Sequence, residues 1–383
     1  MNTSWNITPM GTLCSISSGE SDTKDAIPDG PFAFFDRSKT VKRSGRFLYD
    51  CEALIIPGEG KEFLPRHFRG KFDLHQRAYA LFDFSPDIDV RFLFYFLHYR
   101  ADYFPSVAVG ATVKSLRRRH FEQLPIAFPS ITEQKRIARM LDNAFDGIAT
   151  AKANSERNLK NANALFDSHL QSVFTSRGSD WKREPLATLC EAPRVITYGV
   201  IKLGEETPGG VPCLRTSNVR WLHIDTNGVK HITSDLSKEY SRTILKGGEV
   251  LVNVRGTLGG VAVAGPEMVG WNVSREVAVV PIDSERIDPR FVSYLIGSRE
   301  TQEWLGGVKK GAAYVGINIE DLRLLPVGVP GLAEQREIVT TLESFQSTTT
   351  ILEGIYERKL DALEALKKSL LHEAFTGQLT KAA

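Results

Sequence analysis

Two segments of this chain share one pattern, and each opens a long helical stretch. The first begins Leu-Pro-Ile-Ala-Phe-Pro-Ser-Ile-Thr-Glu-Gln at Leu124, and the second begins Leu-Pro-Val-Gly-Val-Pro-Gly-Leu-Ala-Glu-Gln at Leu325. The copies lie 201 positions apart, and 16 of the 52 positions from Leu124 to Thr175 are identical without a gap. This identity exceeds what shared helix composition would produce, so the sequence predicts an internal duplication.

A second pair of matching segments lies at the start of each copy. Trp5 to Cys14 aligns with Trp181 to Cys190, with identical Trp, Pro, Thr, Leu and Cys residues at an offset of 176. The second copy therefore carries 25 more residues between its two anchors. This arrangement predicts a variable body followed by a constant tail, repeated once along the chain.

Each body has the short apolar runs and turns that are typical of α+β domains with twisted, mostly antiparallel sheets. Each also ends in an amphipathic helix, expected from Asp89 to Arg100 in the first body and from about Pro289 to Leu305 in the second. We therefore divide the chain into a first body, a central helix, a second body and a C-terminal helix. Their expected bounds are 1–125, 126–178, 179–326 and 327–383.

The tails carry an apolar stripe at helical spacing over about 42 residues, which corresponds to a rod of roughly 63 Å. A helix of that length is unusual inside a globular domain, so we expect two coiled-coil-like helices. Each stripe needs a partner, which is either the other tail or a separate chain. Residues assigned to the spacer helices and to partner docking are Glu133, Gln134, Ile137, Leu141, Glu334, Gln335, Ile338 and Leu342.

Several classes of protein are disfavoured by what the sequence lacks. No apolar run approaches the roughly 18 residues of a membrane span, and the first 20 residues do not resemble a signal peptide, so we expect a cytoplasmic protein without a membrane partner. The phosphate-loop, nucleophile-elbow and zinc-protease motifs are all missing. We therefore expect no catalytic, cofactor-binding or metal site in this chain.

The local charge of the first body differs from that of the whole chain. The whole chain has a net charge of +2, whereas the segment from Arg37 to Arg77 has ten basic and five acidic residues. Interleaved glycine, histidine, glutamine and aromatic residues favour loops that approach a nucleic-acid groove, and a solvated loop surface is the alternative. The candidates for DNA contact here are Lys42, Arg43, Lys61, Arg66, His67, Arg69, Lys71, Gln76 and Arg77.

The second body has a sparser polar set that includes the residue types used to read bases. Arg220 and Asn253 belong to this set without being chosen as contacts. The candidates for DNA contact are Arg215, Ser217, Asn218, Arg255, Thr257, Asn272, Ser274 and Arg275.

With these features the chain resembles the specificity subunit of type I restriction-modification systems, which serve host defence. The resemblance is carried by the paired Leu-Pro-x-x-x-Pro-x-x-x-Glu-Gln segments, by the helix ends Phe174-Thr175 and Phe375-Thr376, and by the matching starts of the two bodies. It implies that each body is a target recognition domain for one half of a split, asymmetric DNA site. It also implies that the two constant helices pack antiparallel as a spacer, in a pseudo-twofold arrangement.

The resemblance further implies partners that supply the chemistry. Two modification subunits would methylate adenine with S-adenosylmethionine, and restriction subunits that translocate DNA would use ATP and Mg²⁺. This chain would be a non-catalytic subunit of that DNA adenine methyltransferase and restriction endonuclease complex. The alternatives are a duplicated coiled-coil adaptor that reads no DNA sequence, which leaves the basic segment unexplained, and an enzyme that acts alone.

Overall fold

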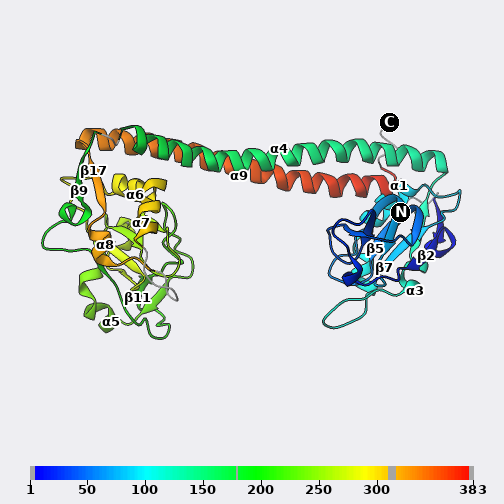
Figure 1. The fold of residues 1–383 in the computed structure, drawn as a ribbon, viewed down its shortest axis with the longest axis horizontal. Coiled ribbons are helices and arrows are strands. Elements are labelled where there is room, and N and C mark those ends of the chain that lie inside the picture. Colours follow the sequence, from blue (N-terminus) through cyan, green and yellow to red (C-terminus); the bar gives the residue numbers. More distant parts are fainter. Residues whose placement is uncertain (1–4, 178–179, 309–315, 379–383) are drawn as a thin grey trace. The chain divides into compact units, whose positions relative to one another are not determined.

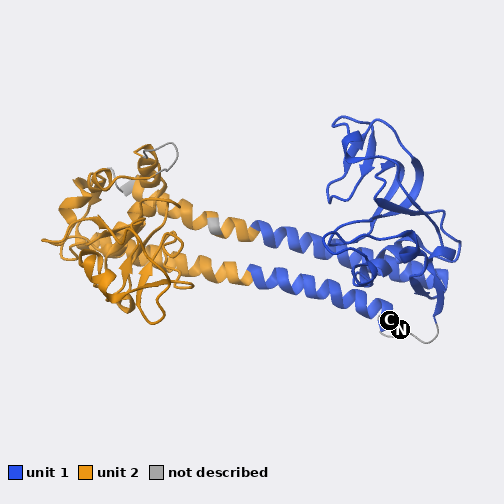
Figure 2. Ribbon diagram, turned by 90° about the horizontal axis from the view of Figure 1, so that it is seen from below, with its two compact units in different colours: residues 1–157, 356–383 blue, residues 158–355 orange. Residues whose placement is uncertain are grey.

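The structure is a computed structural model that describes residues 5–177, 180–308 and 316–378, and it combines helices with open sheets (Figure 1). This confirms the expected mixture of α and β structure. The chain divides into two compact units, residues 1–157 with 356–383 and residues 158–355 (Figure 2). Within the described residues, no helix has the length and apolar character needed to cross a membrane.

Two long helices each contribute to both units. Helix α4 spans Ile131–Arg177, which is 47 residues, and helix α9 spans Leu332–Thr376, which is 45 residues. The division between the units falls inside both helices, after Arg157 in α4 and after Ile355 in α9. Each unit therefore contains one body, the start of one long helix and the end of the other.

The first unit is built on a six-stranded sheet in the order β2-β7-β5-β6-β3-β4. All neighbouring pairs are antiparallel except β3 with β6. The strands are β2 (Ser15–Ser18), β3 (Phe32–Phe35), β4 (Lys42–Ser44), β5 (Tyr49–Pro57), β6 (Arg66–Leu74) and β7 (Ala78–Phe82). Three helices follow: α1 (Val90–Tyr99), α2 (Tyr103–Val107) and α3 (Arg118–Glu122). Helix α1 begins where predicted, because the Asp89 side chain accepts a hydrogen bond from the Phe92 amide at 2.9 Å.

The second unit has two smaller sheets, ordered β10-β16-β13-β14 and β12-β11-β15. The first contains β10 (Thr197–Tyr198), β13 (Val250–Asn253), β14 (Val261–Val263) and β16 (Val277–Val280). The second contains β11 (Val211–Leu214), β12 (Lys230–Ile232) and β15 (Asn272–Val273), and only its β11–β15 pair is parallel. The helices of this body are α5 (Ser234–Glu239), α6 (Pro289–Gly297), α7 (Arg299–Gly307) and α8 (Ile319–Arg323).

The single helix predicted from about 289 to 305 is wrong, because α6 and α7 are separated at Ser298. Side chains satisfy the carbonyl groups that the break leaves free. The Trp221 indole donates to the Gly297 carbonyl at 2.9 Å, and the Gln302 amide donates to the Ile296 carbonyl at 2.7 Å. The Ser298 hydroxyl donates to the Leu295 carbonyl at 2.7 Å. These bonds compensate the interrupted helix ladder.

A two-stranded neck joins the entry and exit of each body. In the first unit β1 (Asn6–Pro9) pairs antiparallel with β8 (Pro125–Phe128). In the second unit β9 (Lys182–Pro185) pairs antiparallel with β17 (Pro326–Val329). Both necks close with the same backbone bond, from the Met10 amide to the Leu124 carbonyl and from the Leu186 amide to the Leu325 carbonyl, each at 2.9 Å. Each body is therefore held at one place where its two ends meet.

The Phe at the end of each long helix packs on the body of its unit. Phe375, at the end of α9, is buried against Phe92, Phe96 and Tyr99 of α1, with ring centroids 5.3 to 5.4 Å apart. Phe174, at the end of α4, lies 5.5 Å from Phe291 of α6. The two ends therefore make equivalent contacts in their respective units.

The apolar stripe of the long helices is only partly buried. Ile137 and Leu141 belong to the core of the first unit, and Ile338 and Leu342 belong to that of the second. By contrast, Leu165, Ile355 and Leu366 are about half exposed. The chain itself therefore leaves these three positions of the stripe uncovered, which fits the alternative of a separate chain at these positions.

Candidate nucleic-acid interface

The basic cluster of the first body lies largely on a strand, which corrects the expectation of loops. Arg66, His67, Arg69 and Lys71 belong to β6, and their strand is paired along its length with β5. Successive side chains of a strand point to opposite faces of the sheet, so Arg66 lies on one face and the other three lie on the other. The strand thus sorts the cluster into two groups with different surroundings.

Arg66 and His67 are engaged within the body. The Arg66 guanidinium donates to the Asp36 carbonyl at 2.9 Å and lies 5.2 Å from the centre of the Phe35 ring. The His67 Nε2 atom is 2.7 Å from the Glu52 carboxylate. These contacts hold the sheet together, so neither side chain is presented freely to a ligand.

The exposed cations of this body are better placed for DNA. Arg69, Lys71 and Lys61 are all exposed. Among the described residues, neither Arg69 nor Lys61 forms a side-chain hydrogen bond or ion pair, and the Lys71 amine lies 4.6 Å over the Phe47 ring. Cations without an acidic partner can neutralise phosphates at the smallest cost.

Arg77 binds a carboxylate of the body instead. The buried Glu59 carboxylate accepts hydrogen bonds from Arg77, from Arg37 at 2.9 Å and from Ser115 at 3.1 Å. Burial alone would raise the pKa of Glu59, but these hydrogen bonds outweigh it and hold the pKa below its usual value. Glu59 therefore remains charged at neutral pH and fixes both arginines.

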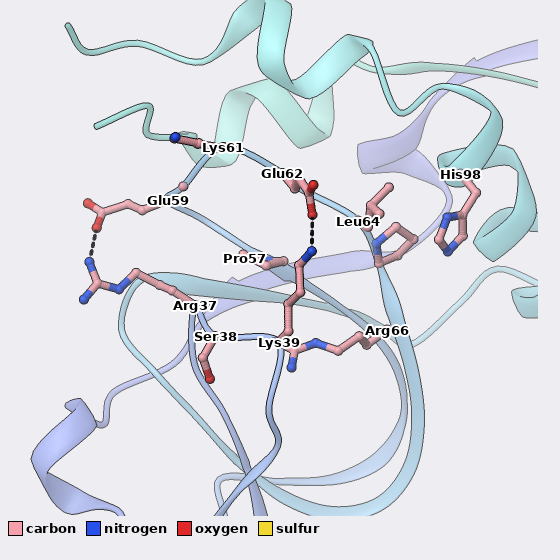
Figure 3. A pocket seen from close by; sticks show the side chains of 12 residues that line it. Arg37, Ser38, Lys39, Pro57, Glu59, Lys61, Glu62, Leu64, Arg66 and His98 are labelled. Carbon is pink, nitrogen blue, oxygen red and sulfur yellow. Dashed lines mark hydrogen bonds and ion pairs between the residues drawn. The ribbon is translucent and has the colours of Figure 1, made fainter. Parts of the chain in front are cut away.

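A pocket of about 600 Å³ opens beside this cluster (Figure 3). Figure 3 shows Arg37 beside Glu59 and Lys39 beside Glu62, and Lys61 extends away from both pairs. The Lys39 amine and the Glu62 carboxylate are 2.8 Å apart and exposed. Because both acids of the lining are paired with cations, Lys61 and Arg66 leave the pocket with an excess of positive charge.

Lys42 and Arg43 secure the edge strand β4. The Lys42 amine lies 2.6 Å from the Asp36 carboxylate. Arg43 donates to the carbonyls of Gly30 and Pro31 at 2.7 and 2.9 Å. Gln76 is exposed and donates to the Asp22 carboxylate at 3.3 Å. Arg43 and Gln76 are exposed and Lys42 is half-buried, but the Arg43 guanidinium is committed to two backbone carbonyls.

Three candidates of the second body belong to its interior, which corrects their assignment as DNA contacts. Asn272 is fully buried, where it accepts from Thr243 at 2.7 Å and donates to the Ser237 hydroxyl at 3.2 Å. Asn218 is buried and donates to the Asp225 carbonyl at 3.0 Å. Ser274 is buried as well. A buried amide whose hydrogen bonds are used inside the protein cannot read a base edge.

The remaining candidates of this body reach the surface. Arg215 is half-buried and donates to the Gly228 carbonyl at 2.9 Å, while Ser217 and Thr257 are exposed. Arg255 and Arg275 are half-buried. The structure therefore retains these five side chains as candidates, with Arg215 already committed to a loop carbonyl.

Asn253 brings the loops that carry these candidates together. Its side-chain amide is buried and donates to the carbonyls of Thr216, Val219 and Thr257 at 3.3, 3.0 and 3.1 Å. One side chain thus ties the loop after β11 to the loop after β13. The sequence placed Asn253 in the polar set. Its positioning role could not be predicted, because it depends on Thr216 and Val219, which lie 37 and 34 positions away.

Tyr198 was missed by the sequence reasoning. The centre of its ring lies 5.5 Å from the Arg255 guanidinium, and the side chain is 39% exposed. The one available signal was an aromatic residue in a short β-type run, which more often marks a core position.

The matching starts of the two long helices are buried inside their own units, which corrects their assignment to partner docking. In the first unit, Gln134 accepts from the Asp89 amide and donates to the Asp87 carbonyl, both at 2.8 Å. In the second, Gln335 accepts from the Asp288 amide at 2.7 Å and donates to the Arg286 carbonyl at 3.4 Å. The buried set, unavailable to another chain, is Gln134, Ile137, Leu141, Gln335, Ile338 and Leu342.

The two glutamates beside these residues are half-buried. Glu133 pairs with Arg136 through two contacts of 2.9 Å, and Glu334 accepts a hydrogen bond from the Trp181 indole at 3.3 Å. Within the described ranges, no group of three or more His, Cys, Asp or Glu side chains could hold a metal ion.

Comparison with known proteins identifies the family. The type I restriction modification DNA specificity domain matches residues 4–160 and 179–358, so it covers most of both units. The chain belongs to this family, and the resemblance predicted from its sequence is confirmed. Nothing in the family assignment supports an adaptor that reads no DNA sequence.

Individual relatives agree with the assignment. The EcoDI specificity subunit of Escherichia coli is 23% identical over 407 residues, covering 98% of this chain and 89% of the relative. The EcoBI specificity subunit, also from Escherichia coli, is 24% identical over 311 residues, covering 75% of this chain and 65% of the relative. The MjaVIII specificity subunit of Methanocaldococcus jannaschii is 24% identical and covers 76% of this chain and 71% of the relative.

Solved structures share the fold. A chain from a study of complex assembly and conformational transition of the type I R-M system has a TM-score of 0.73 at 18% identity, covering 98% of this chain and 99% of that one. The HsdS subunit from Thermoanaerobacter tengcongensis has a TM-score of 0.58 at 17% identity and covers 98% of each chain.

Proposed function

We propose that this chain is the DNA sequence-recognition and scaffold subunit of a type I restriction-modification complex. Each body reads one half of a bipartite, asymmetric DNA site, and α4 and α9 pack antiparallel as a coiled-coil spacer that sets the distance between the halves. The observation that carries this proposal is the match of one family to residues 4–160 and again to 179–358. Equivalent necks and equivalent glutamine contacts in the two units support an internal duplication.

The surface residues of the bodies supply the DNA contacts. In the first body these are Lys61, Arg69, Lys71 and Gln76, and in the second they are Arg215, Ser217, Arg255, Thr257 and Arg275. Lys61, Arg69 and Lys71 neutralise phosphates, while the arginine forks and hydroxyl groups of the second body reach base edges. Two different bodies in a pseudo-twofold arrangement suit an asymmetric site on duplex DNA.

Two modification subunits dock on the long helices. The apolar side chains that α4 and α9 leave exposed are Met140, Leu165, Ile351, Ile355 and Leu366, which range from 36% to 60% exposed. Single exposed apolar residues are common on protein surfaces, so the docking of partners on these helices is inferred from the family and not from these side chains alone. The modification subunits bind S-adenosylmethionine and methylate an adenine turned out of the duplex, and restriction subunits use ATP and Mg²⁺. This chain contributes no catalytic group.

The spacing of the two half-sites tests the proposed function. The full chain with its modification partner should protect a bipartite site, and inserting or deleting one base pair between the halves should abolish protection. The physical reason is that a helix rod does not stretch by the roughly 3.4 Å that one base pair adds along the duplex. Protection that is indifferent to spacing would refute the spacer, and the absence of any protected sequence would refute DNA recognition itself.

Replacing the three free cations of the first body should weaken DNA binding without changing the sequence preference. A plot of log K against log salt has a negative slope, and each phosphate contact contributes about 0.9 to its magnitude. We therefore expect the triple variant Lys61→Ala, Arg69→Ala, Lys71→Ala to make the slope shallower by roughly 2.7. Titrations of labelled duplex at several salt concentrations measure this slope. Lys24→Ala, at an exposed lysine of the same body outside residues 37–77, is the control and should leave the slope unchanged. An unchanged slope in the triple variant would remove these cations from the interface.

A further inference from the structure

Arg255 and Tyr198 form a cation–π pair at the end of the four-stranded sheet of the second body. Arg255 lies two residues after the end of β13 at Asn253, and Tyr198 is the last residue of β10. The guanidinium carbon lies 5.5 Å from the centre of the tyrosine ring. Stacking on an aromatic face suits the planar guanidinium, because it leaves the N–H groups at the edge of the plane available.

The backbone of Arg255 is fixed from two sides. The amides of Val254 and Arg255 both donate to the Glu276 carbonyl, at 2.8 and 3.3 Å. The Ile317 amide donates to the Val254 carbonyl at 2.8 Å. The backbone of Arg255 therefore cannot shift without breaking these backbone hydrogen bonds. The ring of Tyr198 restricts the position of the guanidinium.

The guanidinium is not neutralised by an acid. In the part of the chain that the structure describes, Arg255 forms no side-chain hydrogen bond or ion pair. The nearby Glu276 carboxylate accepts a hydrogen bond from the Ser274 hydroxyl at 3.1 Å and forms no ion pair with Arg255 among the described residues. A preorganised arginine with free N–H groups is suited to bind an acceptor from outside the chain.

The loops around Arg255 permit a close approach by a ligand. The buried Asn253 amide holds the loops that carry Ser217 and Thr257, whose hydroxyl side chains are exposed. Gly256 follows Arg255 with a φ of +70°, a backbone conformation that L side chains rarely adopt, so the next residue along the loop carries no side chain. The described loops next to Arg255 therefore present two exposed hydroxyl groups and a glycine.

We propose that Arg255 reads one guanine in the half-site bound by the second body, that Tyr198 positions the guanidinium, and that Asn253 positions the neighbouring loops. The inference rests on the proposed function and deepens it by naming a base and the residue that recognises it. A guanine presents the O6 and N7 acceptors side by side in the major groove, and these match the two parallel N–H groups of an arginine fork.

A phosphate is the competing ligand for the same guanidinium. A lysine serves a phosphate nearly as well, because a phosphate is recognised largely as a charge. It cannot replace a planar fork that makes two parallel hydrogen bonds to one base. Exchange of Arg255 for lysine therefore distinguishes the two ligands, since the charge stays and the fork is lost.

The experiment selects duplexes from a pool in which the second half-site is randomised. The full chain with its modification partner binds the pool, and the bound fraction is sequenced for wild type, Arg255→Lys, Tyr198→Phe and Tyr198→Ala. Arg183→Lys is the matched control, because Arg183 is an exposed arginine of the same unit that lies 3.6 Å from Glu300 and has no cation–π partner among the described residues. Thermal unfolding of each variant establishes that it is folded.

The expected result is a loss of preference at one base pair. Wild type should select G·C at a fixed position of the second half-site, and Arg255→Lys should reduce that preference at least about tenfold while the other positions keep theirs. Tyr198→Phe retains the ring and should match wild type, whereas Tyr198→Ala should relax the same position as Arg255→Lys. Arg183→Lys should leave every position unchanged.

Other outcomes overturn the inference. In Arg255→Lys, unchanged preferences with at most a small, uniform loss of affinity would assign Arg255 to a phosphate. A second half-site without any selected guanine, or a lysine variant that behaves like wild type, would exclude guanine recognition by Arg255. If wild type selected no sequence at all, the proposed function would fail together with this inference, and that result is distinct from the others.

Discussion

Replacing Phe375 by alanine should destabilise the first unit by about 3–5 kcal/mol, the usual cost of removing a buried phenylalanine. The side chain is 2% exposed and contacts three aromatic residues of α1. Phe375 lies near the end of α9, whereas the aromatic residues that it contacts lie on α1 of the first body. Removal of its ring therefore leaves a cavity between two segments that are distant in sequence. The end of α9 should then separate from the first body.

Hydrogen exchange resolved along the sequence measures this loss in each unit. Amides of α1 and of residues 370–376 should exchange much faster in Phe375→Ala, while protection in the second unit stays at the level of wild type. Phe174→Ala is the matched variant, because Phe174 occupies the equivalent position on Phe291 in the second unit. It should produce the reverse pattern.

A control variant on the same helix separates packing from helix propensity. Ile351 is 60% exposed on α9, and Ile351→Ala should change stability by no more than about 0.5 kcal/mol. Equal loss of protection in both units of Phe375→Ala would contradict the division into two units. A cost below about 1 kcal/mol would show that the end of α9 contributes little to the first body.

The long helices and the α1 helix could be predicted because their signals are local. Asp89 caps α1 within three residues, and the apolar periodicity after Gln134 and Gln335 spans more than 40 positions. Such patterns depend on the chain's own neighbours along the sequence.

Strand β6 was mistaken for loops because its composition is misleading. It contains four of the candidate basic or histidine residues and Gly70, which has a φ of +125°. The alternation that identifies a strand is carried only by Phe68, Phe72 and Leu74 and is interrupted at Gly70. The strand forms because β5 and β3 pair with it from both sides. Pairing partners that lie elsewhere in the chain cannot be inferred from the segment alone.

The sequence alone also could not predict which polar residues are exposed and which are buried. Asn272 and Arg255 are both polar, but Asn272 meets Ser237 and Thr243 in the interior, whereas the Arg255 guanidinium lies over the half-exposed ring of Tyr198. In the same way, the break between α6 and α7 depends on the Trp221 indole, which lies 76 positions from Gly297. Residue type indicates what a side chain can bind, whereas the fold decides what it reaches.

Exchanging the second body for that of another family member should change one half of the DNA site and leave the other half unchanged. The necks explain why the exchange is feasible. Strands β9 and β17 pair in register from Lys182 with Val329 to Pro185 with Pro326, so the body enters and leaves its unit through adjacent strands. An exchange of residues 186–325 retains both strands and replaces everything between them.

The exchanged chain should prefer its new second half-site over the old one by roughly a thousandfold, the lower end of the usual gap between specific and non-specific binding. Methylome sequencing of a host that expresses the exchanged chain with its modification partner identifies both halves in one measurement. The reciprocal exchange of residues 10–124, which retains β1 and β8, should alter only the first half.

The boundaries of the exchange determine whether the neck of the second unit stays intact. An exchange that begins inside β9 removes part of the neck, so it should lower the stability of the second unit even if the new body is itself stable. An exchange at 186–325 should keep wild-type hydrogen-exchange protection in β9 and β17, because the bond from the Leu186 amide to the Leu325 carbonyl uses only backbone atoms. If the intact-neck exchange altered both half-sites, base reading would be shared between the bodies and the assignment of one half-site to each would be wrong.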